Sequence, residues 1–286
     1  MTTENAPSPP TFADPDWIVL PQISHHMLEV AEGPIHYVEA GQGKPLLLLH
    51  GGHGGWIHWM ANIAALACHR RVIAIDMPGF GGSYRPQQTL SLEDYASAVI
   101  SVTSRLSLPQ CDLAGFSFGA AVASMVAAHA SERFASLTLV SPPGIGQPSP
   151  ESAALPARSS ARAKTHGMRA GVENTLRELM LSDPARMSEP LIDLMLQYAR
   201  RTRFATHLVS RGSNTLALLE QVPLRALVVI GALDPYQRHE LAERTLRVNR
   251  ALRQECTIVM GEASHWVQYD RSEPFNRLLI KFLQSA

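Results

Sequence analysis

The sequence is constrained most strongly by the five residues G-F-S-F-G at positions 115–119. They have the pattern G-x-S-x-G and lie between a short apolar run, 110–114, and a run of helix-forming residues, 120–129. Strand, tight turn and helix are the context in which this pattern presents a serine at the end of a sheet. The turn strains the serine backbone, so the residues two positions before and after it must be small. We therefore expect Ser117 in a strained turn at a helix N-terminus, where the Phe118 N–H is free to bind an anion.

Apolar strand-like runs and helical segments alternate over most of the chain. The run 45–49 is continuously apolar, which is typical of a central strand covered on both faces. Between the first two predicted strands, Gly33-Pro34 is expected to form the turn. The alternation predicts an α/β fold, in which helices flank both faces of a mostly parallel sheet. The predicted strands are 26–32, 34–40, 45–49, 71–75, 110–114, 135–141, 225–230 and 255–260, and the predicted helices outside residues 142–222 are 57–67, 92–106, 120–129, 239–248 and 273–283.

The alternation stops at Pro142, and no convincing strand is predicted before Pro223. A helical insertion between two strands of such a sheet is typical of a cap over the site at the sheet edge. Additional core is the alternative, but the prolines at both ends favour a separable unit. We therefore predict a disordered polar arm at residues 1–16, a core of residues 17–141 and 223–286, and a cap of residues 142–222. The helices predicted in the cap are 152–168, 171–180, 189–200 and 205–219.

Ser117 becomes an effective nucleophile only if a base accepts its proton and a carboxylate orients that base. In sheets of this kind the chain order is serine, then an acid, then histidine. Asp234 and His265 each lie just past the end of one of the last two predicted strands. Because the carboxyl ends of parallel strands share one edge, we predict that the three residues converge as a catalytic triad. A turn aspartate before Pro235 is the alternative for Asp234, and we expect Asp76 to be a structural turn residue.

A glycine-rich segment, residues 50–56, follows the third predicted strand. Glycines at this end of a buried strand let the backbone approach a ligand. We expect the Gly52 N–H to join that of Phe118 as an oxyanion hole, with an ordinary flexible loop as the alternative. His53 and His58 lie nearby, but the surrounding glycines hold them at no rigid spacing, so we predict no metal site.

Together these motifs resemble those of the α/β-hydrolase superfamily. The resemblance covers residues 26–286 and rests on H-G-G, D-x-P-G-F-G-x-S, G-x-S-x-G, a late G-x-x-D and a final S-H. It implies a mostly parallel eight-stranded sheet flanked by helices, with a helical cap inserted after the sixth strand. It also implies a covalent acyl-type intermediate and no cofactor. The serine nucleophile argues against the haloalkane dehalogenase branch, which uses an aspartate.

A narrower resemblance is to the meta-cleavage-product hydrolases, which cut carbon–carbon bonds in ring-opened aromatic compounds. It rests on the glycine-rich segment at 50–56, P-G-I-G at 143–146, H-W-V-Q at 265–268 and F-N-R-L at 275–278. In that family the tryptophan after the catalytic histidine helps to form the substrate site. The resemblance therefore implies that Trp266 binds substrate.

Two positions differ from that family's pattern. Phe116 stands where the family usually has asparagine, and Met195 aligns with the cap arginine that binds the substrate carboxylate. Phe116 and Phe118 flank the serine, and they either line an apolar acyl pocket or pack beneath the turn. We take His53 and Phe116, with Trp266, as candidate substrate-binding residues. Three nearby arginines could replace the missing one, although a basic run on a helix is more often a solvated face: Arg200, Arg201 and Arg203.

Composition limits the partners and the compartment. Lys plus Arg and Asp plus Glu number 25 each among 286 residues, and zero net charge argues against nucleic acid or an acidic membrane as the main partner. The three cysteines have no C-x-x-C spacing, which suggests a reducing compartment. No signal peptide is recognisable, and no apolar run approaches the ~18 residues of a membrane helix. We expect a cytoplasmic protein that acts on a small molecule, with a homodimer compatible with these features.

These features predict a serine hydrolase that cleaves a small, largely apolar carboxylic ester through an acyl-enzyme. The first alternative is hydrolysis of a carbon–carbon bond in a vinylogous diketone, as in the meta-cleavage-product hydrolases. The second alternative is a small-molecule receptor that uses the same fold without turnover. The complete set of Ser117, Asp234 and His265 counts against the receptor.

Overall fold

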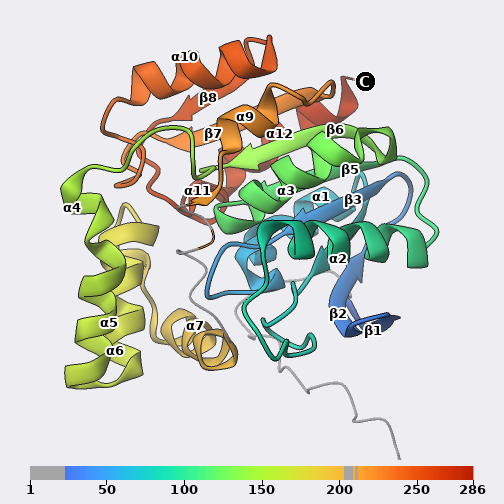
Figure 1. The fold of residues 1–286 in the computed structure, drawn as a ribbon. Coiled ribbons are helices and arrows are strands. Elements are labelled where there is room, and N and C mark those ends of the chain that lie inside the picture. Colours follow the sequence, from blue (N-terminus) through green and yellow to red (C-terminus); the bar gives the residue numbers. More distant parts are fainter. Residues whose placement is uncertain (1–22, 203–208, 210–211, 286) are drawn as a thin grey trace, which may run out of the picture.

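The computed structural model describes residues 23–202, 209 and 212–285 (Figure 1). The predicted arm at residues 1–16 lies outside the described residues. Eight strands form one sheet in the order β1-β2-β4-β3-β5-β6-β7-β8. Strand β2 is antiparallel to both of its neighbours, and the pairs from β4 to β8 are parallel, as the α/β prediction requires. The strands are β1 Ser24–Val30, β2 Gly33–Ala40, β3 Pro45–Leu49, β4 Arg71–Ile75, β5 Cys111–Phe116, β6 Phe134–Val140, β7 Arg225–Gly231 and β8 Thr257–Met260.

Both faces of the sheet are covered by helices (Figure 1). Along β3 the side chains alternate between two apolar clusters: Leu47 and Leu49 belong to one cluster, and Leu46 and Leu48 to the other. All four are fully buried, which confirms that the run 45–49 is a central strand. The helices on one face are α2 Leu92–Arg105, α3 Phe118–His129, α9 Thr215–Leu219 and α10 Leu241–Leu252, and those on the other are η1 Trp56–Trp59, α1 Met60–Ala67, α11 Val267–Asp270 and α12 Ser272–Gln284.

The first hairpin corrects one prediction. Val30 pairs with Gly33, so the turn consists of Ala31 and Glu32, and Gly33 already belongs to β2. The glycine is needed for a different reason: at its φ of 140° an added Cβ would lie 2.8 Å from the side chain of Tyr84. Gly33 therefore serves packing against a distant loop rather than the turn itself.

The described residues between β6 and β7 form helices and no strand, as predicted. The predicted helix 152–168 is wrong as a single unit, because it is divided into α4 and α5 and ends at Gly167, whose φ of 88° terminates α5. The predicted helix 171–180 begins earlier and changes to π-helical geometry at Leu176. The elements are α4 Pro150–Ala153, α5 Leu155–His166, α6 Met168–Thr175, η3 Leu176–Met180, η4 Pro184–Arg186, α7 Glu189–Arg201 and α9. Helices α4 to α7 stand to one side of the sheet in Figure 1.

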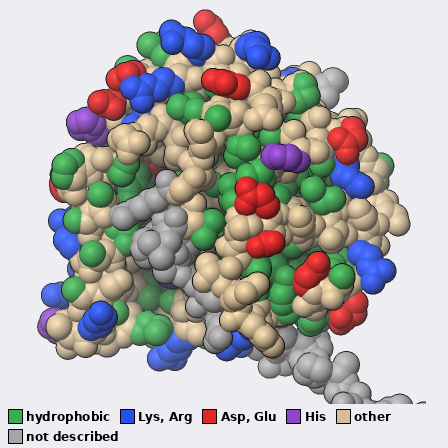
Figure 2. All heavy atoms as spheres, in the orientation of Figure 1, with side chains coloured by type: hydrophobic (Ala, Val, Ile, Leu, Met, Phe, Trp, Pro, Cys, Tyr) green, Lys and Arg blue, Asp and Glu red, His purple; other side chains and the backbone are tan. Residues whose placement is uncertain are grey.

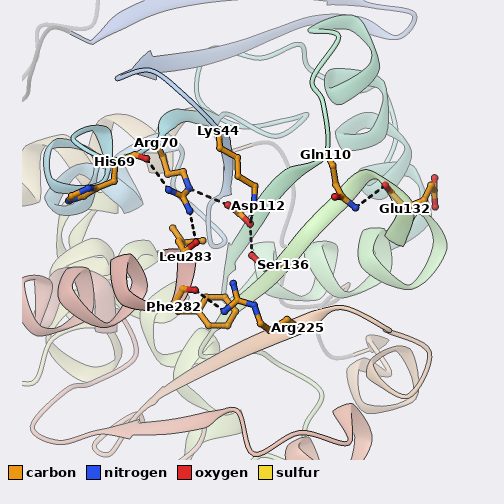
Figure 3. Close-up of polar contacts among 10 residues, drawn as sticks. All are labelled: Lys44, His69, Arg70, Gln110, Asp112, Glu132, Ser136, Arg225, Phe282 and Leu283. Atoms are coloured by element: carbon orange, nitrogen blue, oxygen red, sulfur yellow. Dashed lines mark hydrogen bonds and ion pairs between the residues drawn. The ribbon is translucent and has the colours of Figure 1, made fainter. Parts of the chain in front are cut away.

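The amino ends of the parallel strands carry a buried polar cluster (Figure 3). Asp112, 1% exposed, accepts hydrogen bonds from Ser136 Oγ at 2.7 Å, Lys44 Nζ at 3.3 Å and Arg70 Nε at 3.3 Å. The cluster joins residues at the starts of β3, β4, β5 and β6. The carboxylate of Asp112 is held by hydrogen bonds and by the positive charges of Lys44 and Arg70, so the cluster stabilises the fold. Ser117 lies at the opposite ends of the strands.

Acidic and basic side chains are interspersed over the face shown in Figure 2. Within the described part of the chain, no helix combines the length and apolarity that crossing a membrane requires. Neither observation identifies a partner.

Candidate active site

Ser117 lies in a strained turn between β5 and α3. Its φ of 50° and ψ of −115° are a rare conformation for a residue with a side chain. A Cβ at Gly115 would collide with the carbonyl oxygen of Gly119, and a Cβ at Gly119 would collide with that of His50. The two glycines therefore allow β5, α3 and the segment after β3 to approach one another. The strained turn predicted from G-x-S-x-G is confirmed.

Three side chains from distant parts of the sequence form a hydrogen-bonded chain at the carboxyl edge of the sheet. His265 Nε2 lies 2.8 Å from Ser117 Oγ, and His265 Nδ1 lies 2.8 Å from Asp234 Oδ2. The side chains of His265 and Asp234 are 5% and 0% exposed. With the proton of neutral imidazole on Nδ1, Nε2 is free to accept the serine proton. The arrangement can therefore generate a nucleophilic serine.

Asp234 combines the two interpretations that its sequence context left open. While Oδ2 faces His265, Oδ1 accepts the Tyr236 N–H at 2.9 Å. The aspartate thus organises its own turn before Pro235 as well as the imidazole. The second contact fixes the rotation of the carboxylate, which leaves Oδ2 aimed at the ring.

The histidine segment is also attached to the helical insertion. Leu179 O accepts the N–H of His265 at 3.2 Å and the hydroxyl of Ser264 at 2.7 Å, and Met180 O accepts the N–H of Trp266 at 3.0 Å. Both carbonyls belong to the last two residues of the π-helical segment η3, and the last carbonyl groups of a helix have no N–H partner within it. This part of the insertion is therefore hydrogen-bonded directly to the segment that carries His265.

The glycine-rich segment is held by two buried histidines. His50 Nδ1 lies 2.7 Å from Gly51 O and its Nε2 accepts the Met77 N–H, while His58 Nδ1 accepts the Gly51 N–H at 3.1 Å. Burial lowers the pKa of His50, and burial together with the neighbouring His50 places the pKa of His58 well below its ordinary value. Both rings are therefore neutral near pH 7 and hold the backbone through one fixed tautomer each.

The N–H groups of Gly52 and Phe118 are the candidate oxyanion donors. Gly52 and Phe118 line the same cavity as the serine. Phe118 is the first residue of α3, and the first N–H groups of a helix have no carbonyl partner within it. Backbone N–H groups in this setting can stabilise negative charge on an oxygen bound at Ser117.

A cavity of about 1090 Å³ opens above Ser117 between the sheet edge and the insertion. His53 and Phe116 line it, as expected for the candidate substrate-binding residues. Phe116 also packs beneath the turn, with its ring 5.3 Å from those of His58 and His265, so it borders the cavity and supports the turn. Apolar side chains from the insertion form much of the remaining wall: Leu155, Ala163, Val172, Leu176, Met180 and Met195.

Trp266 corrects the expectation drawn from the narrower resemblance. Its side chain is 0% exposed and is absent from the described residues that line the cavity. The indole stacks on Tyr269 with a centroid distance of 4.3 Å and donates its Nε1–H to His58 O at 2.8 Å. The ring therefore packs between the His58 segment and α11, where it supports the site from behind and does not reach a ligand.

The arginines of the cavity are not those that the sequence suggested. Arg200 is exposed, Arg201 is half-buried and neither lines the cavity, while Arg203 lies outside the described residues. Instead, Arg244 and Arg247 of α10 contribute to the wall. Sequence reasoning missed Arg244, whose one signal is an arginine in register with the buried Val248 and Leu252 of an amphipathic helix.

Asp76 has the structural role predicted for it. Its carboxylate accepts the Trp56 and Gly82 N–H groups at 2.8 and 2.9 Å and contacts His36 Nδ1 at 2.8 Å. It is fully buried and is not one of the residues that the hydrogen bonds through His265 connect to Ser117. Among the described residues, no group of three or more His, Cys, Asp or Glu side chains is placed to hold a metal ion.

Comparison with known proteins agrees with the fold. A model of the alpha/beta hydrolase family matches residues 46–278. Among solved structures, a carboxylesterase from Bacillus subtilis has a TM-score of 0.80 at 20% identity, covering 93% of both chains. A meta-cleavage product hydrolase from Pseudomonas fluorescens IP01 has a TM-score of 0.77 at 23% identity, covering 91% of this chain and 97% of that one.

Curated relatives point to the same family at low identity. A 2-hydroxy-6-oxo-2,4-heptadienoate hydrolase from Pseudomonas putida is 28% identical over 263 residues, covering 86% of this chain and 91% of the relative. The dihydrolipoyllysine-residue acetyltransferase component of an acetoin cleaving system, also from Pseudomonas putida, is 29% identical over 255 residues, and the match covers 85% of this chain. The chain spans only 64% of that component's length. With the family model matching most of the chain and the sheet in the expected order, this protein belongs to the alpha/beta hydrolase family.

Proposed function

We propose that this hydrolase cleaves a largely apolar carboxylic ester through an acyl-enzyme formed on Ser117. The observation that carries the proposal is the hydrogen-bonded chain from Ser117 through His265 to Asp234, with both contacts at 2.8 Å. A serine that is strained, hydrogen-bonded to a potential base and open to a cavity has the features of an acyl-transfer nucleophile.

In the proposed reaction, Ser117 Oγ attacks the ester carbonyl while His265 Nε2 takes its proton. The N–H groups of Gly52 and Phe118 stabilise the oxyanion, and Asp234 stabilises the imidazolium. His265 returns the proton to the leaving alcohol, and the acyl group stays on Ser117. Water then attacks the acyl-enzyme with His265 as base, which releases the acid and restores the serine.

The cavity argues for a larger ester than the sequence suggested. At about 1090 Å³ it is slightly larger than the cavities that usually enclose a drug-sized ligand, about 300–1000 Å³. We propose that the insertion acts as the cap over this cavity, since its apolar side chains form much of the wall. An ester with an extended apolar portion would use more of that wall than a short-chain ester.

Carbon–carbon bond hydrolysis is the second candidate, favoured by the relatives that are named as dienoate hydrolases. Two cavity positions count against it. Phe116 and Met195 stand where the resemblance to the meta-cleavage-product hydrolases leads us to expect asparagine and arginine, and both line the cavity. Their apolar side chains cannot hydrogen-bond a carboxylate beside the nucleophile. A receptor without turnover would not need the aligned Ser117 and His265.

Two experiments test the proposal. Intact-mass analysis after incubation with a fluorophosphonate should show one adduct on the wild type, none on Ser117→Ala and one on Ser160→Ala, a control that removes another serine of the cavity wall. Turnover is then compared for a series of p-nitrophenyl esters and a ring-opened dienoate. Absence of any wild-type adduct would contradict an activated serine and favour the receptor. Turnover of the dienoate alone would replace ester cleavage by carbon–carbon cleavage.

A further inference from the structure

The wall of the cavity contains a buried cation that the proposed reaction does not use. Arg244 lies on the inner face of α10, in register with Val248 and Leu252. It is 2% exposed, yet it lines the cavity together with Arg247. Gly146 makes room for it, because a Cβ there would lie 3.0 Å from the guanidinium carbon.

The contacts of Arg244 are all with uncharged acceptors. Its Nε donates to His239 O at 2.9 Å, Nη1 donates to Gln237 Oε1 at 3.1 Å, and Nη2 donates to Gln147 O. A guanidinium has five N–H groups, so these three contacts leave two N–H groups for another acceptor. The guanidinium is therefore held in place with part of its donor capacity unused.

Within the described part of the chain, Arg244 forms no ion pair. Two of the neighbouring acids are engaged elsewhere: Asp234 faces His265, and Glu243 pairs with Arg247. Burial lowers the pKa of Arg244, and the attraction of Glu240 and Asp234 only partly opposes this effect. A guanidinium nonetheless keeps its proton, and a buried charge without a counter-charge is costly. An anionic group brought by a ligand would supply the missing charge.

The position of Arg244 relative to the nucleophile follows from two contacts. The ring of Tyr236 lies edge-on to that of His265 at 5.3 Å, and the adjacent Gln237 is bonded to Arg244. Both residues line the cavity. Arg244 therefore belongs to the wall that begins beside His265, along the turn that carries Asp234.

We infer that the α10 end of the cavity binds a carboxylate of the substrate that is remote from the scissile bond. The inference rests on the proposed ester hydrolysis and specifies its substrate class: an ester that carries a second, free carboxylate, such as a half-ester of a dicarboxylic acid. Arginine matches the planar shape of a carboxylate, and charge-assisted hydrogen bonds are stronger than neutral ones. The apolar wall would hold the chain between the two ends.

Binding of product analogues tests the inference without requiring turnover. Isothermal titration calorimetry measures the Kd of straight-chain α,ω-dicarboxylates and of alkanoates of equal length, over a series of chain lengths. The wild type should bind the best dicarboxylate at least ~10-fold more tightly than the matched alkanoate, which is the gain expected for one charge-assisted contact. Arg244→Met should abolish this preference. Arg247→Gln is the matched control, because Arg247 lines the same wall but already pairs with Glu243, and it should retain the preference.

Three results would overturn the inference: no preference at any chain length, a preference that survives in Arg244→Met, or an equal loss in Arg247→Gln. The comparison between two ligands on one variant separates recognition from structure, since a purely structural role of Arg244 would weaken both ligands alike. Labelling and ester turnover by the wild type are measured separately. If they succeed and the preference is absent, this inference alone fails, whereas absent labelling contradicts the proposed function itself.

Discussion

The Nδ1 atom of His58 accepts the backbone N–H of Gly51 at 3.1 Å. The ring is fully buried and packs edge-on against Phe116 and Trp266. A neutral histidine in this position fixes the peptide between His50 and Gly51, one residue before the proposed oxyanion donor Gly52. One buried side chain thus connects the glycine-rich segment to the strand that carries Ser117 and to the segment that carries His265.

Replacing His58 tests this connection. In His58→Phe the acceptor is lost and the Gly51 N–H is left unpaired, so the segment shifts and kcat should fall by roughly 10- to 100-fold, less than loss of an entire oxyanion donor. KM should change little, because the cavity wall is intact. His58→Asn places a carbonyl oxygen near the former Nδ1 and should restore much of kcat. Steady-state kinetics on a p-nitrophenyl ester measure both constants, and equal kcat values for the two variants would contradict the role.

The buried histidines also predict how stability depends on pH. The pKa values of His50 and His58 are lowered in the folded protein, so the unfolded chain binds protons that the folded protein does not. Stability is therefore complete above about pH 6.5, the unfolded value, and falls as the pH decreases below it. Each histidine contributes a slope of roughly 1.4 kcal/mol per pH unit until its folded pKa is reached.

Urea unfolding between pH 5 and 7.5 measures this slope. His58→Asn should make the slope shallower by about one histidine's share, whatever it does to stability at pH 7.5. The control is His69→Gln, which removes an exposed histidine and should leave the slope unchanged. An identical slope in the wild type and His58→Asn would show that His58 is protonated equally in both states.

Asp234 and Asp112 are both buried, but they lie at opposite ends of the strands. Replacing Asp234 should reduce activity, whereas replacing Asp112 should reduce stability. In Asp234→Asn the amide cannot stabilise the imidazolium and selects the wrong tautomer of His265, so kcat should fall by ~10⁴-fold while stability changes little. In Asp112→Asn the contacts with Lys44 and Arg70 lose their counter-charge. Stability should fall by about 1–3 kcal/mol with kcat unchanged. Kinetics and urea unfolding on both variants check the pair, and a large kcat loss in Asp112→Asn would contradict the separation.

The glycines around Ser117 should tolerate no side chain. In Gly115→Ala the new Cβ meets the carbonyl of Gly119, so β5 and α3 must move apart at a cost of about 3 kcal/mol or more. Gly261→Ala is the control, because no atom lies within 4 Å of the added Cβ. Its stability should stay within about 0.5 kcal/mol of the wild type. Similar urea midpoints for the two variants would contradict the close approach of β5 and α3 at the Ser117 turn.

Most of the sheet was predictable because a strand produces a short run of apolar residues that can be recognised in the local sequence. The run 45–49 could only be a doubly buried strand, and the two faces of β3 confirm it. The hairpin turn was misplaced because the need for Gly33 arises from Tyr84, a residue far along the chain. The insertion was predicted as helical, but its breaks at Gly167 and Leu176 depend on packing that helix-forming composition does not report.

The sequence by itself determined the fold and the meeting of Ser117, Asp234 and His265. Residues that follow parallel strands of one sheet lie at the same end of it, so the pattern of strands places all three at the carboxyl ends of β5, β7 and β8. Only the tertiary structure decided what surrounds them. Whether Trp266 faces a ligand, and which arginine enters the cavity, depend on how whole helices dock against the edge. The way a helix docks depends on many weak contacts between residues that are far apart in the sequence, so it cannot be predicted from local sequence patterns.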